Sequence, residues 1–202
     1  MYLFETMKLE KGQISRLIYH EDRIQRSSKM LNIPFDQSKW DDLIQTIQHQ
    51  YNQGIYRLKV MLEENGELEY VVAPLSSKSQ FTATIVPEHN GSSHLTKINK
   101  TSNRNHVTYR LDTDLALIYD KNGKILEFDI GNIMIKENGN YYTPQYNEDF
   151  LLGCMRQYLI DHGKLKEKNY YIDDFINKVK GNEIEVFLLN SLREVADVTI
   201  YL

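Results

Sequence analysis

Residues 115–132 read LALIYDKNGKILEFDIGN, and this stretch decides how the chain folds. Two apolar runs flank the dipeptide Asn122-Gly123. Asn-Gly between apolar runs is a strong hairpin signal, because both turn positions favour a positive φ. We therefore predict a β-hairpin that brings Glu127 onto a strand paired with Ile118.

Working outward, the rest of the chain carries the signals of further strands and helices. Apolar patterning predicts strands over residues 3–8, 55–62, 68–72 and 81–86. Asn138-Gly139 predicts another hairpin turn. A helix is predicted to open at His20, and Asp36 is placed to cap the N-terminus of a second helix. Proline and serine in residues 74–79 are typical of a linker.

Composition is that of an ordinary folded protein and excludes several kinds of function. The 202 residues carry a net charge of −4 and no dominant basic run, so we expect no nucleic-acid partner. Cys154 is the only cysteine, which excludes an intramolecular disulfide and favours a cytoplasmic location. We expect neither a secretion signal nor a membrane span, because no stretch has the required pattern. The 6 histidines lack zinc-like spacing, so no metal is expected.

Several short motifs bear side chains that are suited to chemistry. In chain order they are Phe4-Glu5-Thr6-Met7-Lys8, His20-Glu21-Asp22-Arg23-Ile24, Asn99-Lys100-Thr101-Ser102-Asn103-Arg104, Glu127 with Asn132, Tyr142-Thr143-Pro144, Leu151-Leu152-Gly153-Cys154-Met155-Arg156 and Asn190-Ser191-Leu192-Arg193. Each motif alone is more often a plain structural element, such as an edge strand or a solvated helix face. Their order along nearly the whole chain gives them weight.

In this order the motifs resemble those of the class IV pyridoxal-phosphate enzymes. Within that class they are most similar to the 4-amino-4-deoxychorismate lyases of the compact type that is fused to aminodeoxychorismate synthase. The resemblance implies an α+β protein of fold type IV, with a small N-terminal α/β domain and a larger C-terminal, β-rich, barrel-like domain. We place the small domain at residues 1–74, the linker at 75–80 and the cofactor-binding domain at 81–202. The resemblance also implies a homodimer.

The cofactor implied by the resemblance is pyridoxal 5′-phosphate. Lys100 would carry it as a Schiff base, with Lys97 as the next candidate. Lysine suits this role because its pKa falls readily in a desolvated site. Glu127, followed by Asn132, would keep the pyridine nitrogen protonated, since an opposite charge favours the ionised form.

The same resemblance implies which groups bind the cofactor phosphate. Arg23 would contribute its planar guanidinium, and Ser191 would contribute its hydroxyl. Gly153 stands where a helix would begin, so the backbone amides of Cys154 and Met155 would face the phosphate. Cys154 would thus act through its amide and not as a nucleophile.

The implied activity is that of a carbon–oxygen lyase in folate biosynthesis, which releases pyruvate from aminodeoxychorismate and leaves 4-aminobenzoate. Thr6 would lie at the active site. Lys8, Arg104 and Arg193 would bind the two carboxylates of the substrate. Aminodeoxychorismate synthase would act upstream.

The chain departs from the family pattern at three points, and two alternatives stay open. Asn99 stands where the fused lyases have histidine, Leu126 replaces a threonine, and the leading hairpin of longer class IV enzymes is missing. A class IV transaminase acting on branched-chain or D-amino acids would use the same Lys100 and Glu127. A non-catalytic binding module could keep the fold without the chemistry.

Overall fold

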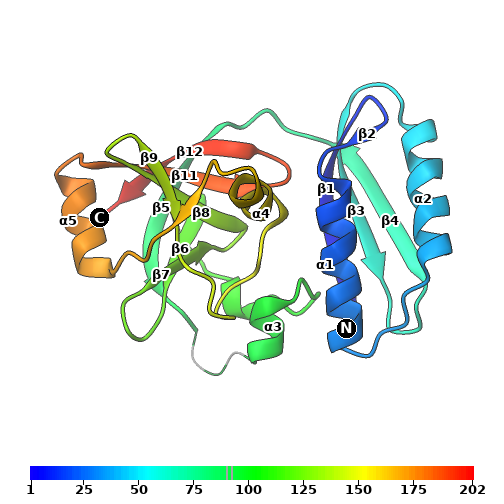
Figure 1. The fold of residues 1–202 in the computed structure, drawn as a ribbon, viewed down its shortest axis with the longest axis horizontal. Coiled ribbons are helices and arrows are strands. Elements are labelled where there is room, and N and C mark those ends of the chain that lie inside the picture. Colours follow the sequence, from blue (N-terminus) through cyan, green and yellow to red (C-terminus); the bar gives the residue numbers. More distant parts are fainter. Residues whose placement is uncertain (90, 92) are drawn as a thin grey trace. The chain divides into compact units, whose positions relative to one another are not determined.

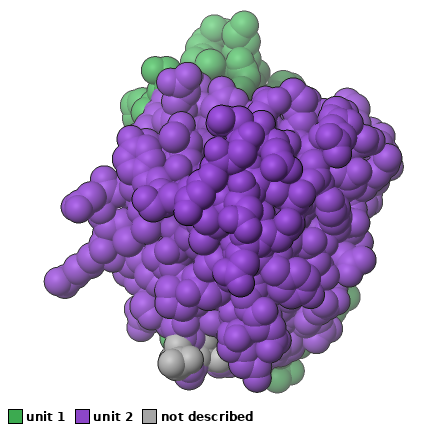
Figure 2. Space-filling model, turned by 90° about the vertical axis from the view of Figure 1, so that its left-hand side faces the viewer, with its two compact units in different colours: residues 1–77, 99–103 green, residues 78–98, 104–202 purple. Residues whose placement is uncertain are grey.

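A computed structural model describes residues 1–89, 91 and 93–202, which form two compact units (Figures 1 and 2). The first unit consists of Met1–Ser77 and Asn99–Asn103, and the second of Lys78–Ile98 and Arg104–Leu202. Asn99–Asn103 belongs to the first unit, because its backbone contacts lie mainly there. The boundaries expected from sequence place this segment in the cofactor-binding domain. No described helix is long and apolar enough to cross a membrane.

The first unit is a four-stranded antiparallel sheet with two helices packed on one face (Figure 1). The strand order is β2-β1-β3-β4. The strands are β1 (Leu3–Glu10), β2 (Gln13–Ile14), β3 (Ile55–Leu62) and β4 (Leu68–Pro74), and the helices are α1 (Leu17–Met30) and α2 (Gln37–Gln50). Alternate residues of β1 are buried, which is the period-2 pattern of a strand with one face on the core. The predicted strands are confirmed.

Both predicted helices of this unit are present. Helix α1 begins at Leu17, three residues before the predicted opening at His20. Helix α2 begins after Asp36, whose carboxylate accepts a hydrogen bond from the Lys39 amide at 3.2 Å. Asp36 is therefore the predicted N-cap, and it satisfies an amide that has no partner within the helix.

The segment Asn99–Asn103 lies along an edge of β1 in the first unit. The Phe4 amide donates to the Lys100 carbonyl at 3.0 Å, and the Ser102 amide donates to the Tyr2 carbonyl at 2.8 Å. A β-bridge joins Leu3 to Thr101. These backbone bonds fix the Lys100 main chain against the first strand.

The second unit is a closed barrel of six strands with a two-strand extension. The sheet order is β10-β9-β8-β11-β12-β5-β6-β7, and an additional β7–β8 pairing closes the ring. The strands are β5 (Gln80–Pro87), β6 (Leu115–Tyr119), β7 (Ile125–Phe128), β8 (Gly131–Glu137), β9 (Asn140–Thr143), β10 (Lys166–Glu167), β11 (Ile184–Asn190) and β12 (Glu194–Tyr201). The helices are α3 (His94–Ile98), the 3₁₀ turn η1 (Asn105–Val107), α4 (Cys154–Asp161) and α5 (Ile172–Lys180). The predicted barrel-like, β-rich unit is confirmed.

The predicted hairpin connects β6 and β7. It contains a β-bulge that the sequence does not predict. Leu117 pairs with Phe128, and Tyr119 pairs with Ile125, so two residues of β7 oppose the single residue Ile118. Such a β-bulge re-aims side chains, and bulges are frequent beside active sites. Glu127 is one of the two β7 residues at the bulge.

Candidate functional site

Glu127 is a buried carboxylate on β7, with only 5% of its surface exposed. Among the described residues its hydrogen-bond donor is the Leu151 amide, at 3.3 Å. Burial raises the pKa of Glu127 to about 8, although the positive charge of Arg104 opposes this shift. This carboxylate is suited to receive a cationic partner, because its charged form is poorly compensated.

Asn132 faces Glu127 directly across the β7–β8 pair and fixes the loop that precedes α4. The Asn132 side-chain amide donates to the Leu151 carbonyl at 2.9 Å and accepts from the Gly153 amide at 2.9 Å. A Cβ atom built at Gly153 would lie 2.1 Å from Asn132 Oδ1, so only glycine fits there. One side chain thus links the strand that bears Glu127 to the start of the helix.

Helix α4 begins at Cys154, and its N-cap Gly153 forms no side-chain capping bond. Sequence analysis predicted this helix start. The amides of the first turn carry the positive end of the helix dipole, which favours anions. Both Cys154 and Met155 are buried. Arg156 of the same motif donates to the Pro144 carbonyl at 2.8 Å, so it holds the loop and not a ligand.

Arg104 and Asp129 are two charged groups of the second unit that influence Glu127. One Arg104 Nη donates to the Asp129 carbonyl at 3.3 Å. The Asp129 carboxylate accepts from the Ala116 amide at 3.2 Å, and burial raises its pKa to about 6. The positive charge of Arg104 lowers the pKa of Glu127, against the larger effect of burial. Its sequence-based role toward a substrate carboxylate stays a prediction.

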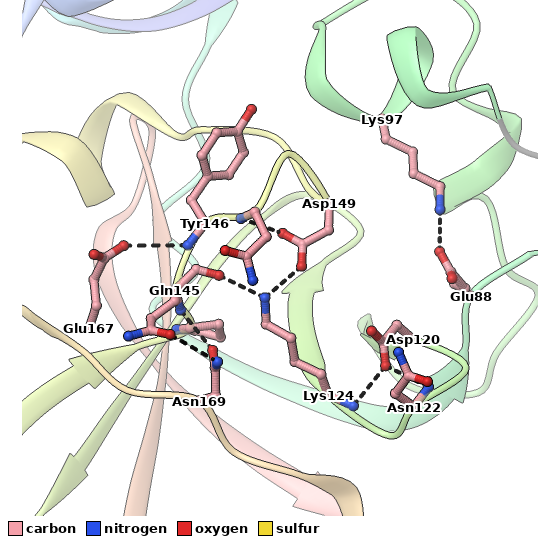
Figure 3. Close-up of polar contacts among 12 residues, drawn as sticks. Glu88, Lys97, Asp120, Asn122, Lys124, Gln145, Tyr146, Asp149, Glu167 and Asn169 are labelled. Atoms are coloured by element: carbon pink, nitrogen blue, oxygen red, sulfur yellow. Dashed lines mark hydrogen bonds and ion pairs between the residues drawn. The ribbon is translucent and has the colours of Figure 1, made fainter.

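A small cavity of about 20 Å³ lies beside Glu127. It has room for about one water molecule. Burial and the charges of Arg104 and Lys97 lower the pKa of His106 to about 4, so its ring is neutral. Lys97, on α3, forms an ion pair with Glu88 (Figure 3). The cavity is lined by Glu88, Lys97, His106, Val107, Ile118, Leu126, Glu127 and Asp149.

Lys124 is a buried lysine that sequence analysis missed. Its Nζ donates to the Gln145 carbonyl at 2.7 Å and to Asp149 Oδ2 at 2.5 Å (Figure 3). The Asp120 carboxylate accepts from the Lys124 amide at 2.9 Å, which fixes the β6–β7 turn. This network ties the hairpin that bears Glu127 to the loop before α4. A lysine is rarely buried unless it is paired, and the partners here lie 21 and 25 residues away, so no local signal exists.

Ser191 and Arg193 lie at the tight turn between β11 and β12. Asn190 Oδ1 accepts from the amides of Leu192, at 3.0 Å, and Arg193, at 2.8 Å. Asparagine is favoured in turns because its side chain bonds the backbone ahead of it. The asparagine of this motif therefore shapes the turn, while the roles of Ser191 and Arg193 stay predictions.

In the first unit, Lys100 lies against the aromatic ring of Phe4. Its Nζ is 5.3 Å from the ring centroid. Thr6 and Lys8 follow Phe4 on the same face of β1, and Lys8 forms an ion pair with Glu10 at 2.8 Å. Lys100 belongs to the first unit and Glu127 to the second. That both residues bind the same cofactor molecule stays a prediction.

Arg23 lies in a buried network that includes Glu5, a residue to which sequence analysis gave no role. Arg23 donates from Nε to Glu5 Oε1 at 2.8 Å and from Nη2 to Glu5 Oε2 at 2.5 Å. His20 Nδ1 lies 2.6 Å from Glu5 Oε2. Burial alone would raise the pKa of Glu5, but Arg23 and His20 together hold it far below its usual value. The phosphate role of Arg23 stays a prediction.

Comparison with known proteins places these sites in a family context. The family model described as amino-transferase class IV matches residues 2–112 and 109–201. A Schizosaccharomyces pombe protein with a provisional assignment as aminodeoxychorismate lyase is 27% identical over 207 residues, which cover 96% of this chain and 87% of that protein.

Solved structures share the fold. A provisionally assigned amino-acid aminotransferase from Mesorhizobium loti superposes with a TM-score of 0.83 at 22% identity and covers 99% of both chains. A provisionally assigned 4-amino-4-deoxychorismate lyase from Haemophilus somnus gives a TM-score of 0.72 at 22% identity over 95% of this chain and 96% of that chain. A hypothetical aminotransferase from Mycobacterium tuberculosis, solved with pyridoxal phosphate bound, gives 0.80 at 16% identity over 98% of this chain and 81% of that chain.

Proposed function

Because the chain belongs to the amino-transferase class IV family, we propose that it is a 4-amino-4-deoxychorismate lyase that uses pyridoxal phosphate. The reaction releases pyruvate from aminodeoxychorismate and leaves 4-aminobenzoate. The observation that carries the cofactor is the buried, poorly compensated carboxylate of Glu127 opposite Asn132. The similarity to the S. pombe protein over nearly the whole chain supports the lyase assignment within the family.

The residues of the second unit fit such a cofactor. When bound, pyridoxal phosphate supplies an aromatic ring that accepts electron density from the substrate. Glu127 would keep a proton on the pyridine nitrogen, since an opposite charge favours the ionised form. The start of α4, where Gly153 makes no side-chain capping bond, suits a phosphate, because the amides of a first helical turn carry a positive partial charge. We assign the phosphate to the amides of Cys154 and Met155.

Two further residues complete the proposed phosphate site. Ser191 contributes a hydroxyl from the turn between β11 and β12. Arg23 is included because of its motif on α1, and its guanidinium also holds Glu5. An arginine fork can serve several acceptors at once, because it carries five N–H donors.

Lys100 is the residue to which we assign the proton transfer. Its Nζ would hold the cofactor in the resting protein and would be a free amine once the substrate is bound. The free amine then accepts the proton from C4 of the substrate. The bond between C3 and the enolpyruvyl oxygen breaks, the released enolpyruvate takes up a proton and becomes pyruvate, and the ring becomes aromatic. Thr6, Lys8, Arg104 and Arg193 are proposed to orient the substrate and its two carboxylates.

An alternative within the family is a transaminase acting on branched-chain or D-amino acids. It is supported by the similarity in fold to aminotransferases such as the M. loti protein. The Phe4-to-Lys8 and Asn190-to-Arg193 motifs favour the lyase. We also propose a homodimer in the cytoplasm, with aminodeoxychorismate synthase as the upstream enzyme.

The test is to incubate the purified protein with pyridoxal phosphate and aminodeoxychorismate. We expect pyruvate and 4-aminobenzoate in equal amounts, together with a visible absorbance band of the bound cofactor. Lys100→Ala should lose both the products and the band while keeping the circular dichroism of the wild type. Steady amino transfer between an amino acid and a keto acid, without pyruvate release, would assign the transaminase. A colourless protein that gains no band would support the non-catalytic module.

A further inference from the structure

Two lysines contact the same aromatic ring on the face of the small sheet that points away from α1 and α2. Lys59 Nζ is 4.7 Å from the Phe4 ring centroid, and Lys100 Nζ is 5.3 Å from it. The two nitrogens therefore lie no farther apart than the sum of these distances. Lys59 is on β3 and pairs with Thr6 of β1, so its side chain shares the face of Phe4 and Thr6. Lys59 is thus a neighbour of the amine that we assign to the chemistry.

The ammonium group of Lys59 is positioned by aromatic side chains and not by an acid. It donates to the Tyr2 hydroxyl at 3.1 Å and lies 4.9 Å from the Tyr2 ring centroid. In the described part of the chain, no carboxylate forms an ion pair with Lys59. An ammonium has three donors, and ring faces attract it without accepting its hydrogen bonds fully. Lys59 is therefore a half-buried cation, held in place, with donors left for an anion.

Lys8 provides a contrast on the same face of the sheet. It was nominated from sequence for a substrate carboxylate, but its Nζ lies 2.8 Å from the Glu10 carboxylate. The Lys8 ammonium lowers the pKa of Glu10. The positive charge of Lys8 is therefore already partly compensated by the Glu10 carboxylate. No described carboxylate pairs with Lys59, which packs on the ring that Lys100 also contacts.

We propose that Lys59 binds a carboxylate of the substrate beside the atom that reacts at Lys100. This inference rests on the proposed function and extends it, because it adds a recognition residue that the motifs did not include. Phe4 serves as the common platform that sets the spacing between the two amines. The substrate class that fits is a cyclic amine with a carboxylate close to the reacting ring. Lys59 would select for that carboxylate and leave the cofactor chemistry to Lys100.

The experiment compares Lys59→Met with Lys59→Arg and with Lys39→Met in the holoenzyme. Lys39 is an exposed residue of α2, so its variant controls for the loss of one positive charge in the same unit. We measure kcat and KM for pyruvate release, the affinity for pyridoxal phosphate, and the binding of chorismate by calorimetry. Chorismate carries two carboxylates and no 4-amino group, so it reports carboxylate recognition alone.

For Lys59→Met we expect KM and the chorismate Kd to rise about tenfold or more, because a hydrogen bond to a charged group is lost. Cofactor affinity and the absorbance band should stay unchanged, and Lys59→Arg should recover most of the binding. Lys39→Met should match the wild type. A chorismate Kd within about twofold of the wild type in Lys59→Met overturns the proposal, as does an equal loss of cofactor binding.

The same measurements separate this proposal from the proposed function. If the wild type binds chorismate but releases no pyruvate, the lyase assignment fails, and the Kd of Lys59→Met still decides the role of Lys59. If the wild type does not bind chorismate at all, the substrate class is wrong and both fail.

Discussion

Two carboxylates, one in each unit, are both buried, but their surroundings are opposite. Glu5 is held by the Arg23 guanidinium and by His20, and its pKa lies far below the usual value. Glu127 receives one backbone amide at 3.3 Å, and burial raises its pKa to about 8. A buried charge is tolerated when the protein itself supplies the opposite charge. The comparison separates an acid whose charge the fold compensates from an acid whose charge the fold leaves poorly compensated.

The largest effect is expected from Glu5→Gln, which removes the carboxylate charge that Arg23 and His20 compensate. The substitution leaves the Arg23 charge buried without its partner, so we expect a loss of about 3–5 kcal/mol in the free energy of unfolding at pH 7. Urea unfolding followed by circular dichroism measures it. A loss below about 1 kcal/mol would mean that the Glu5 network does not stabilise the first unit.

A smaller effect, dependent on pH, is expected from Glu127→Gln in the cofactor-free protein. The pKa of Glu127 rises from its ordinary value of 4.5 to about 8 on folding, so the folded state binds the proton more tightly than the unfolded chain does. Wild-type stability should therefore fall as the pH rises through this interval, by roughly a few kcal/mol, and then level off. Glu127→Gln should lack the part of this decline that Glu127 causes, while the smaller part due to Asp129, whose pKa burial raises to about 6, should remain. Parallel pH profiles in the two proteins would contradict the account.

The smallest effect on stability is expected from Gly153→Ala, which tests how the loop next to Glu127 is held. The new Cβ would collide with Asn132 Oδ1, at 2.1 Å, and should cost about 1–3 kcal/mol. Affinity for pyridoxal phosphate should fall as well, because the start of α4 moves. Gly181→Ala is the matched control, since its closest neighbour is the flexible end of Glu183, at 2.8 Å. Thermal unfolding and a cofactor titration check both variants, and equal losses would remove the special role of Gly153.

Local signals in the sequence predicted most of the strands, helices and turns of the fold. Asn122-Gly123 predicted the β6–β7 hairpin, Asp36 predicted a helix cap, and Gly153 predicted the start of α4. Each works because its chemistry acts over a few neighbouring residues, such as the positive φ of 81° at Gly123.

Features that depend on distant partners could not be predicted in the same way. The Glu5–Arg23 pair joins residues 18 apart, and Lys124 finds Asp149 25 residues away. The bulge opposite Ile118 changes the register without a glycine or proline to mark it. These features arise from packing between elements, which a local pattern does not encode.

The measurement that tests the central claim most directly is the titration of the Glu127 carboxyl group by carbon NMR, with Glu127→Gln to assign the signal. Without cofactor, we predict a pKa near 8, so that the group is largely neutral at pH 7. With pyridoxal phosphate bound, it should be ionised at pH 7. A pKa near the ordinary 4.5 in the cofactor-free protein, or a titration that the cofactor leaves unchanged, would contradict the account.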